Sequence, residues 1–561
     1  MKLNPVLLLA FLSTFSCTNQ PSQKEKTTDN ETPTVSKQYP FLWENANVYF
    51  LLTDRFANGD TTNDHAYGRR HDGEKLRSYE GGDIRGIIQK LDDGYFDRLG
   101  ITAIWTTPLF ENIHGAVDEG SGKTYAYHGY WPRDWSNIDA NLGTMADYKE
   151  LVDKAHAHGI RVLMDVIINH TGPVTDIDNA WPDDWVRKGP PCTYQNFETN
   201  VSCALAGHLD DIRTDSDKPV ELPQFLLDKW KAEGRLDKEQ AELDAFFERT
   251  GYPRAPRFYL IKWITDYVRE LGIDGFRVDT AKHTEAFVWA ELFKEAQLAF
   301  EEWKKNHPDE VLDDKPFYMV GEVYGYSIHS GETYNYGDSV VNFFDNGFES
   351  LINFSFKSDA NQEPEELFSV YSNALNGELK GKELLNYLDS HDDGGPFDRM
   401  RERTFEAGTK LLLAPGASQV YYGDETARPL HFEDLGHDAD LRSFMNWDDL
   451  KNNTKKNGYT TSDVFAHYSK LGRFRRAHPA VGAGVHKMIS ESPYVFSRTL
   501  NTDNLTDQVV VVLDKTNGPV DVSSVFADGV ELKDYYSGAV ATVKDGKVSF
   551  DTAQDILLIG E

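Results

Sequence analysis

The sequence predicts an α/β fold: a (β/α)8 TIM barrel with a domain inserted after its third strand and an all-β domain at the C-terminal end. Short apolar stretches alternate with helix-length amphipathic stretches between residues 44 and 480. This alternation is interrupted from 171 to 256, and after 480 it gives way to short strands separated by Gly, Asn and Asp. The 561 residues are enough for a barrel of roughly 250 residues or more and a smaller domain.

The predicted barrel strands are mostly apolar, as expected for parallel strands that helices cover on both faces. We place these strands at 47–56, 101–108, 160–169, 274–279, 317–320, 340–344, 384–388 and 418–422. We place the helices at 82–100, 145–158, 258–271, 285–305, 364–375, 401–413 and 464–476. Residues 508–514 and 547–551 are typical of the strands of the C-terminal domain. A TIM barrel keeps its chemistry at the carboxyl ends of its strands, so polar residues there are the candidates for a site.

The composition is strongly acidic, with 91 Asp and Glu against 58 Lys and Arg and a formal net charge of −33. Nucleic acids and anionic membrane surfaces bind proteins through a basic surface. The charge therefore argues against both as partners, whereas a neutral polymer is compatible with it.

The first residues have the layout of an export signal. Lys2 precedes an apolar run at 5–15, which is too short to span a bilayer, and Ser16 and Cys17 follow. A cysteine at this point resembles a bacterial lipoprotein processing site, so we interpret 1–17 as a signal peptide ending at a lipidated Cys17 and 18–43 as a flexible tether. Ordinary signal cleavage is the alternative. Either way the protein is exported, and it meets a membrane only through a lipid anchor because no other stretch could cross one.

The two remaining cysteines, Cys192 and Cys203, lie eleven residues apart in a loop rich in Gly and Pro. Disulfides form in the compartments to which exported proteins go, so the pair predicts one small bridge rather than a metal site. Closing so short a loop should stabilise the fold by about 2–3 kcal/mol.

Residues 275–283 read Gly-Phe-Arg-Val-Asp-Thr-Ala-Lys-His, a short strand that runs into a loop. Side chains alternate along a strand, so Arg277 and Asp279 share one face. The arginine should keep the pKa of Asp279 low and the carboxylate ionised, as a nucleophile requires. A structural ion pair is the alternative.

Three further strands also end in polar residues. They read Met-Asp-Val-Ile-Ile-Asn-His at 164–170, Tyr-Met-Val-Gly-Glu-Val-Tyr-Gly at 318–325 and Leu-Asn-Tyr-Leu-Asp-Ser-His-Asp-Asp at 385–393. In this order and at this spacing, the four stretches resemble the conserved motifs of the α-amylase superfamily of glycoside hydrolases, over about 44–480. The resemblance implies retaining cleavage of a glycosidic bond, which needs two carboxyl groups about 5–5.5 Å apart.

The resemblance also implies a role for each acid. Asp279 would be the nucleophile, Glu322 the general acid and base, and Asp392 a third acid that grips sugar hydroxyls, while Asp165 would pair with Arg277. Neighbouring carboxylates should raise the pKa of Glu322 and keep it protonated. The family stacks a sugar on the tyrosine of His-Gly-Tyr-Trp, here Tyr130. The other expected substrate-binding residues are Arg277, His128, Trp131, His170, Lys282, His283 and His391, of which Lys282 and His283 match contacts on the aglycone side.

One or two Ca²⁺ ions follow from the same resemblance. Leu209-Asp-Asp-Ile-Arg213 stands where the family has Leu-Pro-Asp, although the proline is missing. This implies Asn169, Asp211 and the backbone oxygen of His283 as ligands. A polar loop after the first strand is similar to the first calcium site of cyclodextrin glycosyltransferases and offers the hard oxygen ligands that calcium prefers. Its expected ligands are Asn58, Asp60, Asn63, Asp64, Gly81 and Asp83.

By the same comparison the barrel comprises 44–170 and 257–479, a protruding domain B comprises 171–256, and a C-terminal β-sandwich comprises 480–561. The charged helical piece at 223–249 is similar to the periplasmic amylases. Cyclodextrin glycosyltransferases carry further C-terminal domains, whereas this chain ends after one, which favours hydrolysis. We expect a monomer that hydrolyses internal α-1,4-glucosidic bonds of starch- or glycogen-type glucans.

Two alternatives remain open at this stage. One is an α-glucan transglycosylase, or a cyclodextrin or maltogenic hydrolase, with the same three acids. The other is a catalytically inactive glucan-binding protein, which the presence of all three acids with Arg277 and His391 disfavours.

Overall fold

The structure is a computed structural model that describes residues 39–433, 435, 437–515 and 518–561. The predicted signal peptide, Cys17 and most of the predicted tether lie outside these ranges. Across the described ranges, no helix is both long enough and apolar enough to cross a membrane.

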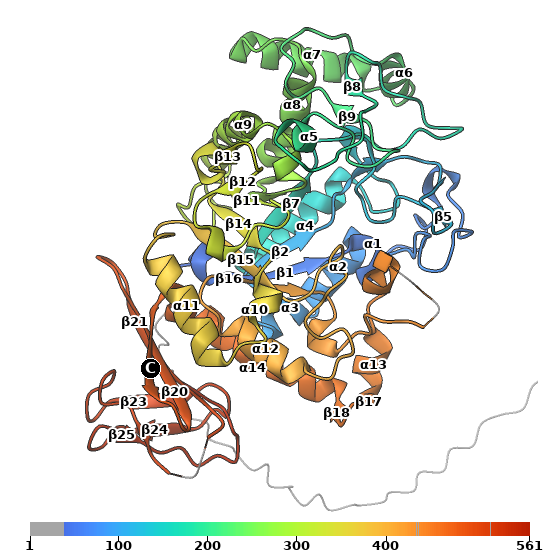
Figure 1. Cartoon of the computed structure of the whole chain (residues 1–561). Coiled ribbons are helices and arrows are strands. Elements are labelled where there is room, and N and C mark those ends of the chain that lie inside the picture. The colour runs from blue at the N-terminus through green and yellow to red at the C-terminus, as the bar shows by residue number, and fades with distance from the viewer. Residues whose placement is uncertain (1–38, 434, 436, 516–517) are drawn as a thin grey trace, which may run out of the picture. The chain divides into compact units, whose positions relative to one another are not determined.

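Eight parallel strands form a closed barrel, which confirms the predicted fold class (Figure 1). In order around the barrel they are β1 (Asn47–Leu51), β2 (Ala103–Thr106), β7 (Arg161–Val166), β10 (Gly275–Val278), β11 (Tyr318–Gly321), β14 (Ser350–Asn353), β15 (Glu383–Tyr387) and β16 (Ala417–Tyr421), which pairs back with β1. The strands are buried nearly throughout, as expected for a sheet that helices cover on its outer face.

Longer helices alternate with these strands, and local sequence signals mark the ends of some of them. They are α2 (Ile84–Asp92), α4 (Met145–Ala157), α8 (Pro256–Leu271), α9 (Ala286–Asn306), α11 (Pro364–Asn376), α12 (Thr404–Leu412) and α14 (Thr461–Ala477). Thr144 and Asp147 form a capping box at the start of α4. Helix α8 starts with Pro256 and ends at Gly272, whose φ of 77° suits glycine in a helix C-cap.

The predicted sixth strand, at 340–344, is wrong. The barrel strand is β14, whereas Val340–Val341 is a two-residue strand, β13, that pairs with β12 (Tyr334–Asn335) outside the barrel. The side chain of Val340 is 59% exposed. The true strand carries polar Ser350 and Asn353 in the barrel, where the Asn353 amide donates to Asn386 Oδ1 at 2.9 Å, so its sequence lacks the apolar run that we used as the signal.

Two other predicted elements are divided. The first strand ends at Leu51, and Thr53–Phe56 forms the short helix α1. The predicted helix 82–100 breaks at Gly94, whose φ is 66°, into α2 and α3 (Tyr95–Arg98). The barrel strand therefore ends earlier than predicted, and two shorter helices stand where one was predicted.

Residues 171–256 lie between β7 and α8 and contain short elements, green in Figure 1. They are β8 (Val186–Arg187), α5 (Glu198–Val201), β9 (Asp211–Ile212), α6 (Gln224–Ala232) and α7 (Leu236–Thr250). Strand β8 pairs with β9, and Cys192 is bonded to Cys203 as predicted.

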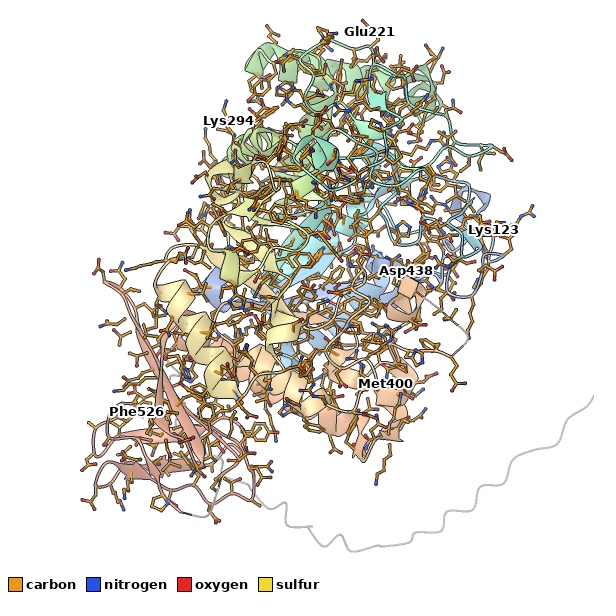
Figure 2. All side chains as sticks on the ribbon, in the orientation of Figure 1. Lys123, Glu221, Lys294, Met400, Asp438 and Phe526 are labelled. Carbon is orange, nitrogen blue, oxygen red and sulfur yellow. A yellow bond between two sulfur atoms is a disulfide. The ribbon has the colours of Figure 1, made fainter. Side chains whose placement is uncertain are left out.

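The C-terminal part is all-β, as predicted. A six-stranded antiparallel sheet has the order β19 (Val485–Ser490), β20 (Tyr494–Asn501), β21 (Thr506–Leu513), β26 (Leu557–Gly560), β23 (Glu531–Asp534) and β24 (Val540–Thr542). A second, two-stranded sheet joins β22 (Val520–Asp521) and β25 (Lys547–Val548). Both sheets contribute to one apolar core that includes Val510, Val548 and Phe526, and Phe526 is labelled in Figure 2.

Candidate active site

The three predicted acids follow the carboxyl ends of barrel strands and line one cleft. Asp279 directly follows β10, Glu322 directly follows β11, and Asp392 lies five residues after β15. The cleft has a volume of about 540 Å³ and is lined by all three. Sites that enclose small ligands commonly measure ~300–1,000 Å³. Residues far apart in the sequence therefore meet at one recess over the barrel.

Arg277 contacts three acidic side chains in this recess. Its Nη1 lies 2.8 Å from Asp279 Oδ1 and 2.9 Å from Asp165 Oδ1, and its Nη2 lies 3.2 Å from Glu322 Oε2. The strand register explains the contact with Asp165, because Arg277 on β10 stands directly beside Asp165 on β7. Tyr130 and Trp105 also donate hydrogen bonds to Asp165 Oδ2, at 2.7 and 2.9 Å.

The expectation of a low pKa for Asp279 is wrong. Burial raises the pKa of this carboxyl to about 6, Arg277 opposes the rise, and Asp165 adds to it. Proximity to an arginine alone does not decide the pKa, because loss of hydration penalises the charged form more strongly here. Asp279 still has a pKa below neutrality, so its carboxylate form predominates at neutral pH.

Glu322 has a higher pKa than Asp279. Burial raises the pKa of Glu322 to about 8, Arg277 lowers it, and Asp279 and Asp392 raise it further. The backbone N–H of Thr280 donates to Glu322 Oε2 at 2.8 Å and opposes the rise. The predicted direction is correct, although burial is a larger cause than the neighbouring carboxylates. Two carboxyls whose pKa values lie on opposite sides of neutrality are suited to act as an acid and a nucleophile.

Asp392 is held as an anion by Arg442 and His391. Burial of the site opposes its ionisation, but His391 and Arg442 outweigh this and lower the pKa of Asp392. His391 Nε2 lies 2.8 Å from Asp392 Oδ2, and Arg442 Nη2 lies 2.6 Å from Asp392 Oδ1. This side chain is 42% exposed toward the cleft, so its oxygens remain accessible to a ligand.

Arg442 was not identified from the sequence. It ends a 3-10 helix, η7 (His437–Arg442), and its Nη1 also lies 2.8 Å from Asp438 Oδ2. Asp438, which is labelled in Figure 2, lines the same cleft and lies 2.9 Å from Arg77 Nη2. The pairs of Arg442 with Asp392 and of Arg77 with Asp438 join loops far apart in the chain, and no local pattern marks them.

The remaining predicted substrate-binding residues gather at the same place. His128, Tyr130, Trp131, His170, Lys282 and His283 line the cleft, and Arg277 and His391 line an adjoining pocket that shares Glu322 and Asp392. The ring of Tyr130 stacks on His391 with centroids 5.1 Å apart. A flat aromatic surface therefore lies beside Asp392.

Two tyrosines of the cleft also escaped the sequence analysis. Tyr194, in the disulfide loop, is 52% exposed, and Tyr324 is 49% exposed. Their rings lie 6.0 and 5.3 Å from Lys282 Nζ. The position of Tyr324, two residues after Glu322, was an available signal, whereas Tyr194 depends on the fold of the inserted region.

The polar loop after β1 fits a hard cation. Asn58 Oδ1 and Asn63 Oδ1 are buried without a hydrogen-bond partner among the described residues. Asn58 Nδ2 lies 2.9 Å from Asp64 Oδ1, and a Cβ atom on Gly81 would collide with both side chains. Orphaned amide oxygens beside a carboxylate are the donor type that Ca²⁺ takes.

The other two residues predicted for this loop already have partners. Asp83 caps α2 and accepts from the backbone N–H groups of Gly59, Asp60 and Gly86. Asp60 accepts from Thr62 in solvent. Throughout the described ranges, no group of three or more His, Cys, Asp or Glu side chains is arranged to hold a metal, so amide and backbone oxygens would have to contribute.

The second predicted set, Asn169, Asp211 and the His283 carbonyl, also comes together. Asn169 Nδ2 lies 2.8 Å from His283 O and 3.4 Å from Asp211 Oδ1. An additional residue, Arg187, donates from Nε to Asp211 Oδ2 at 2.6 Å. A guanidinium therefore already occupies one oxygen of the single carboxylate in this set.

A protonated carboxyl beside a carboxylate, at the carboxyl ends of barrel strands, is an arrangement suited to a glycoside hydrolase. The model of the alpha-amylase family, described as the alpha amylase catalytic domain, matches residues 50–484, and the chain belongs to this family. The resemblance seen in the motifs is thereby confirmed.

Individual relatives agree with this assignment. The chain is 37% identical over 533 residues to the periplasmic alpha-amylase of Escherichia coli (strain K12), covering 84% of this chain and 72% of that protein. It is 26% identical over 501 residues to a cyclomaltodextrin glucanotransferase of Bacillus sp. (strain 38-2), of which it spans only 60%. The crystal structure of an Anoxybacillus alpha-amylase superposes with a TM-score of 0.64 at 25% identity, over 93% of this chain and 99% of that one.

Proposed function

We propose that this protein is an α-amylase that hydrolyses internal α-1,4-glucosidic bonds of starch- or glycogen-type glucans with retention of configuration. The observation that carries the proposal is the contact of Arg277 with both Asp279 and Glu322, whose pKa values lie at about 6 and about 8. At neutral pH one carboxyl is therefore ready to attack while the other has a proton to give.

The reaction has two steps. In the first, the Asp279 carboxylate attacks the anomeric carbon while Glu322 transfers its proton to the departing glycosidic oxygen, which leaves a glycosyl ester on Asp279. In the second, Glu322 as a carboxylate takes a proton from water, the water oxygen attacks the same carbon, and the Asp279 carboxylate is released. Two inversions at one carbon give net retention.

The other residues of the cleft bind and orient the sugar. Asp392, ionised between His391 and Arg442, accepts hydrogen bonds from sugar hydroxyls. Aromatic rings offer flat apolar faces to the C–H faces of glucosyl units, and Tyr130, Tyr194 and Tyr324 line the same cleft as the acids. A structure of the fold neighbour from Geobacillus thermoleovorans contains acarbose, which supports a glucan-like ligand.

Calcium and export complete the proposal. The residues that would hold Ca²⁺ in the loop after β1 are Asn58, Asn63, Asp64 and Gly81, and the bound ion would stabilise this loop without taking part in the chemistry. The periplasmic designation of the Escherichia coli relative supports export, and Cys17 remains the proposed lipid attachment site.

Matches to cyclomaltodextrin glucanotransferases keep a transferring enzyme as the second candidate. A timed product profile on amylose and on cyclodextrin separates the two. An endo-hydrolase releases oligosaccharides of mixed length from the first time points, together with a rapid fall in viscosity. A single short product, or cyclodextrins formed from amylose, would contradict internal hydrolysis. An inactive glucan-binding protein would give no new reducing ends in either assay.

A further inference from the structure

Asp211 lies where the inserted region meets the barrel. The backbone N–H of Ile212 on β9 donates to the Asn169 carbonyl at 2.8 Å, and that of Thr171 donates to the Asp210 carbonyl at 3.0 Å. The Asn169 amide in turn contacts the carbonyl of His283, a residue that lines the active-site cleft. The group that neutralises the charge of Asp211 therefore also helps to hold His283, which forms part of the cleft wall.

Arg187 is placed to neutralise it. Arg187 on β8 stands directly opposite Asp211 on β9 in the strand register. Its Nε donates to Asp211 Oδ2 at 2.6 Å, and its Nη1 lies 3.3 Å from Asp215 Oδ2. The side chains of Asp211 and Arg187 are 2% and 13% exposed, so water screens this pair weakly.

The donor set does not fit Ca²⁺. Calcium takes six to eight oxygens and favours carboxylates, whereas this set offers one carboxylate, one amide and one backbone carbonyl. Arg187 already occupies Asp211 Oδ2, so an added divalent ion would stand beside a guanidinium that repels it in a place from which water is largely excluded. The nearby Glu285 accepts from Thr214 Oγ1 at 2.6 Å and is engaged elsewhere.

We propose that Arg187 replaces the calcium ion expected at Asn169, Asp211 and His283, so that the inserted region is tied to the barrel by a guanidinium and not by a metal. The tie needs no exchangeable ion, because Arg187 belongs to the same chain. The wall of the cleft at His283 is then independent of calcium, and the loop with Asn58 and Asp64 is the remaining calcium site among the described residues.

Equilibrium dialysis of the metal-stripped full chain against Ca²⁺ tests the proposal. We expect Asp64→Ala to bind no calcium and Asp211→Asn to bind as much as the wild type. Calcium that Asp64→Ala still binds and that Asp64→Ala/Asp211→Asn loses would overturn the proposal. A wild type that binds no calcium at all supports the role of Arg187 and removes the loop site instead.

Thermal unfolding gives a second readout. In the Asp64→Ala background, which removes the proposed calcium site of the loop after β1, we expect the melting temperature to be the same in chelator and in calcium. Adding Arg187→Gln exposes an unpaired Asp211 carboxylate, so we expect a lower melting temperature that added Ca²⁺ partly restores. If calcium raises the melting temperature of Asp64→Ala as much as that of Asp64→Ala/Arg187→Gln, the proposal is overturned. If the double variant fails to fold, the dialysis of Asp64→Ala alone decides.

Discussion

Nη2 of Arg277 lies 3.2 Å from Oε2 of Glu322, while Nη1 of the same guanidinium lies 2.8 Å from Oδ1 of Asp279. One cation therefore favours ionisation of both proposed catalytic carboxyls. Burial outweighs the arginine at both, and it raises the pKa of Glu322 to about 8 and that of Asp279 to about 6. The difference between the two carboxyls thus arises from their surroundings and not from which of them contacts the arginine.

The first prediction concerns pH. Activity requires ionised Asp279 and protonated Glu322, so it should fall below about pH 6 as Asp279 gains a proton and above about pH 8 as Glu322 loses one. The profile of kcat/KM against pH, measured on a soluble maltooligosaccharide, should be bell-shaped, and its two limbs belong to the coupled pair. Constant activity well into the alkaline range would contradict the assignment of Glu322 as the acid.

The second prediction separates the nucleophile from the acid. Asp279→Asn should lower kcat on starch by about 10⁴-fold or more, the scale seen when one member of a catalytic set is lost. Glu322→Gln should be similarly slow on starch but much less impaired on a maltosyl fluoride, whose leaving group needs no proton. Both variants should keep the wild-type melting temperature. Near wild-type turnover by Asp279→Asn would refute its role as the nucleophile.

The third prediction concerns Arg442. Arg442→Gln removes the 2.6 Å partner of Asp392 and should raise the pKa of that acid. Loss of one charge-assisted hydrogen bond costs about 1.5–3 kcal/mol, so kcat/KM should fall by about 10- to 100-fold. The acid limb of the pH profile belongs to Asp279 and should stay near pH 6.

A neighbouring ion pair provides the control. Arg399 binds Asp440 of η7 at 2.8 Å and is not among the residues that line the cleft. Arg399→Gln should leave kcat/KM close to that of the wild type. If both variants lower kcat/KM equally, the effect of Arg442 arises from the stability of η7 and not from Asp392.

The sequence predicted the parts of this fold that depend on local patterns. Seven of the eight strands lie where apolar runs placed them. The acids lie close together because they follow strand ends, and a parallel barrel brings those ends to one face. The sixth strand was misplaced because Ser350 and Asn353 are polar inside the barrel. The apolar residue Val340 suggested a barrel strand, but it is exposed and belongs to β13 outside the barrel.

Long-range relationships could not be predicted in this way. The pKa of Asp279 depends on how much water the folded chain excludes, which a motif does not record. Arg442 and Arg187 meet their aspartates at sequence separations of 50 and 24 residues. Neither arginine belongs to a periodic pattern or motif, so only the folded structure identifies its partner.

The last prediction concerns the disulfide loop, which carries Tyr194 into the cleft. Cys192→Ser/Cys203→Ser frees the loop, so we expect unfolding free energy to fall by about 2–3 kcal/mol through the chain entropy of the unfolded state. The freed loop also holds Tyr194 less firmly, so KM for maltooligosaccharides should rise while kcat changes little. Tyr194→Ala in the intact disulfide is the matched control: it should raise KM without lowering the melting temperature. If the double serine variant keeps the wild-type KM although its melting temperature falls, the bridge stabilises the fold but does not position Tyr194.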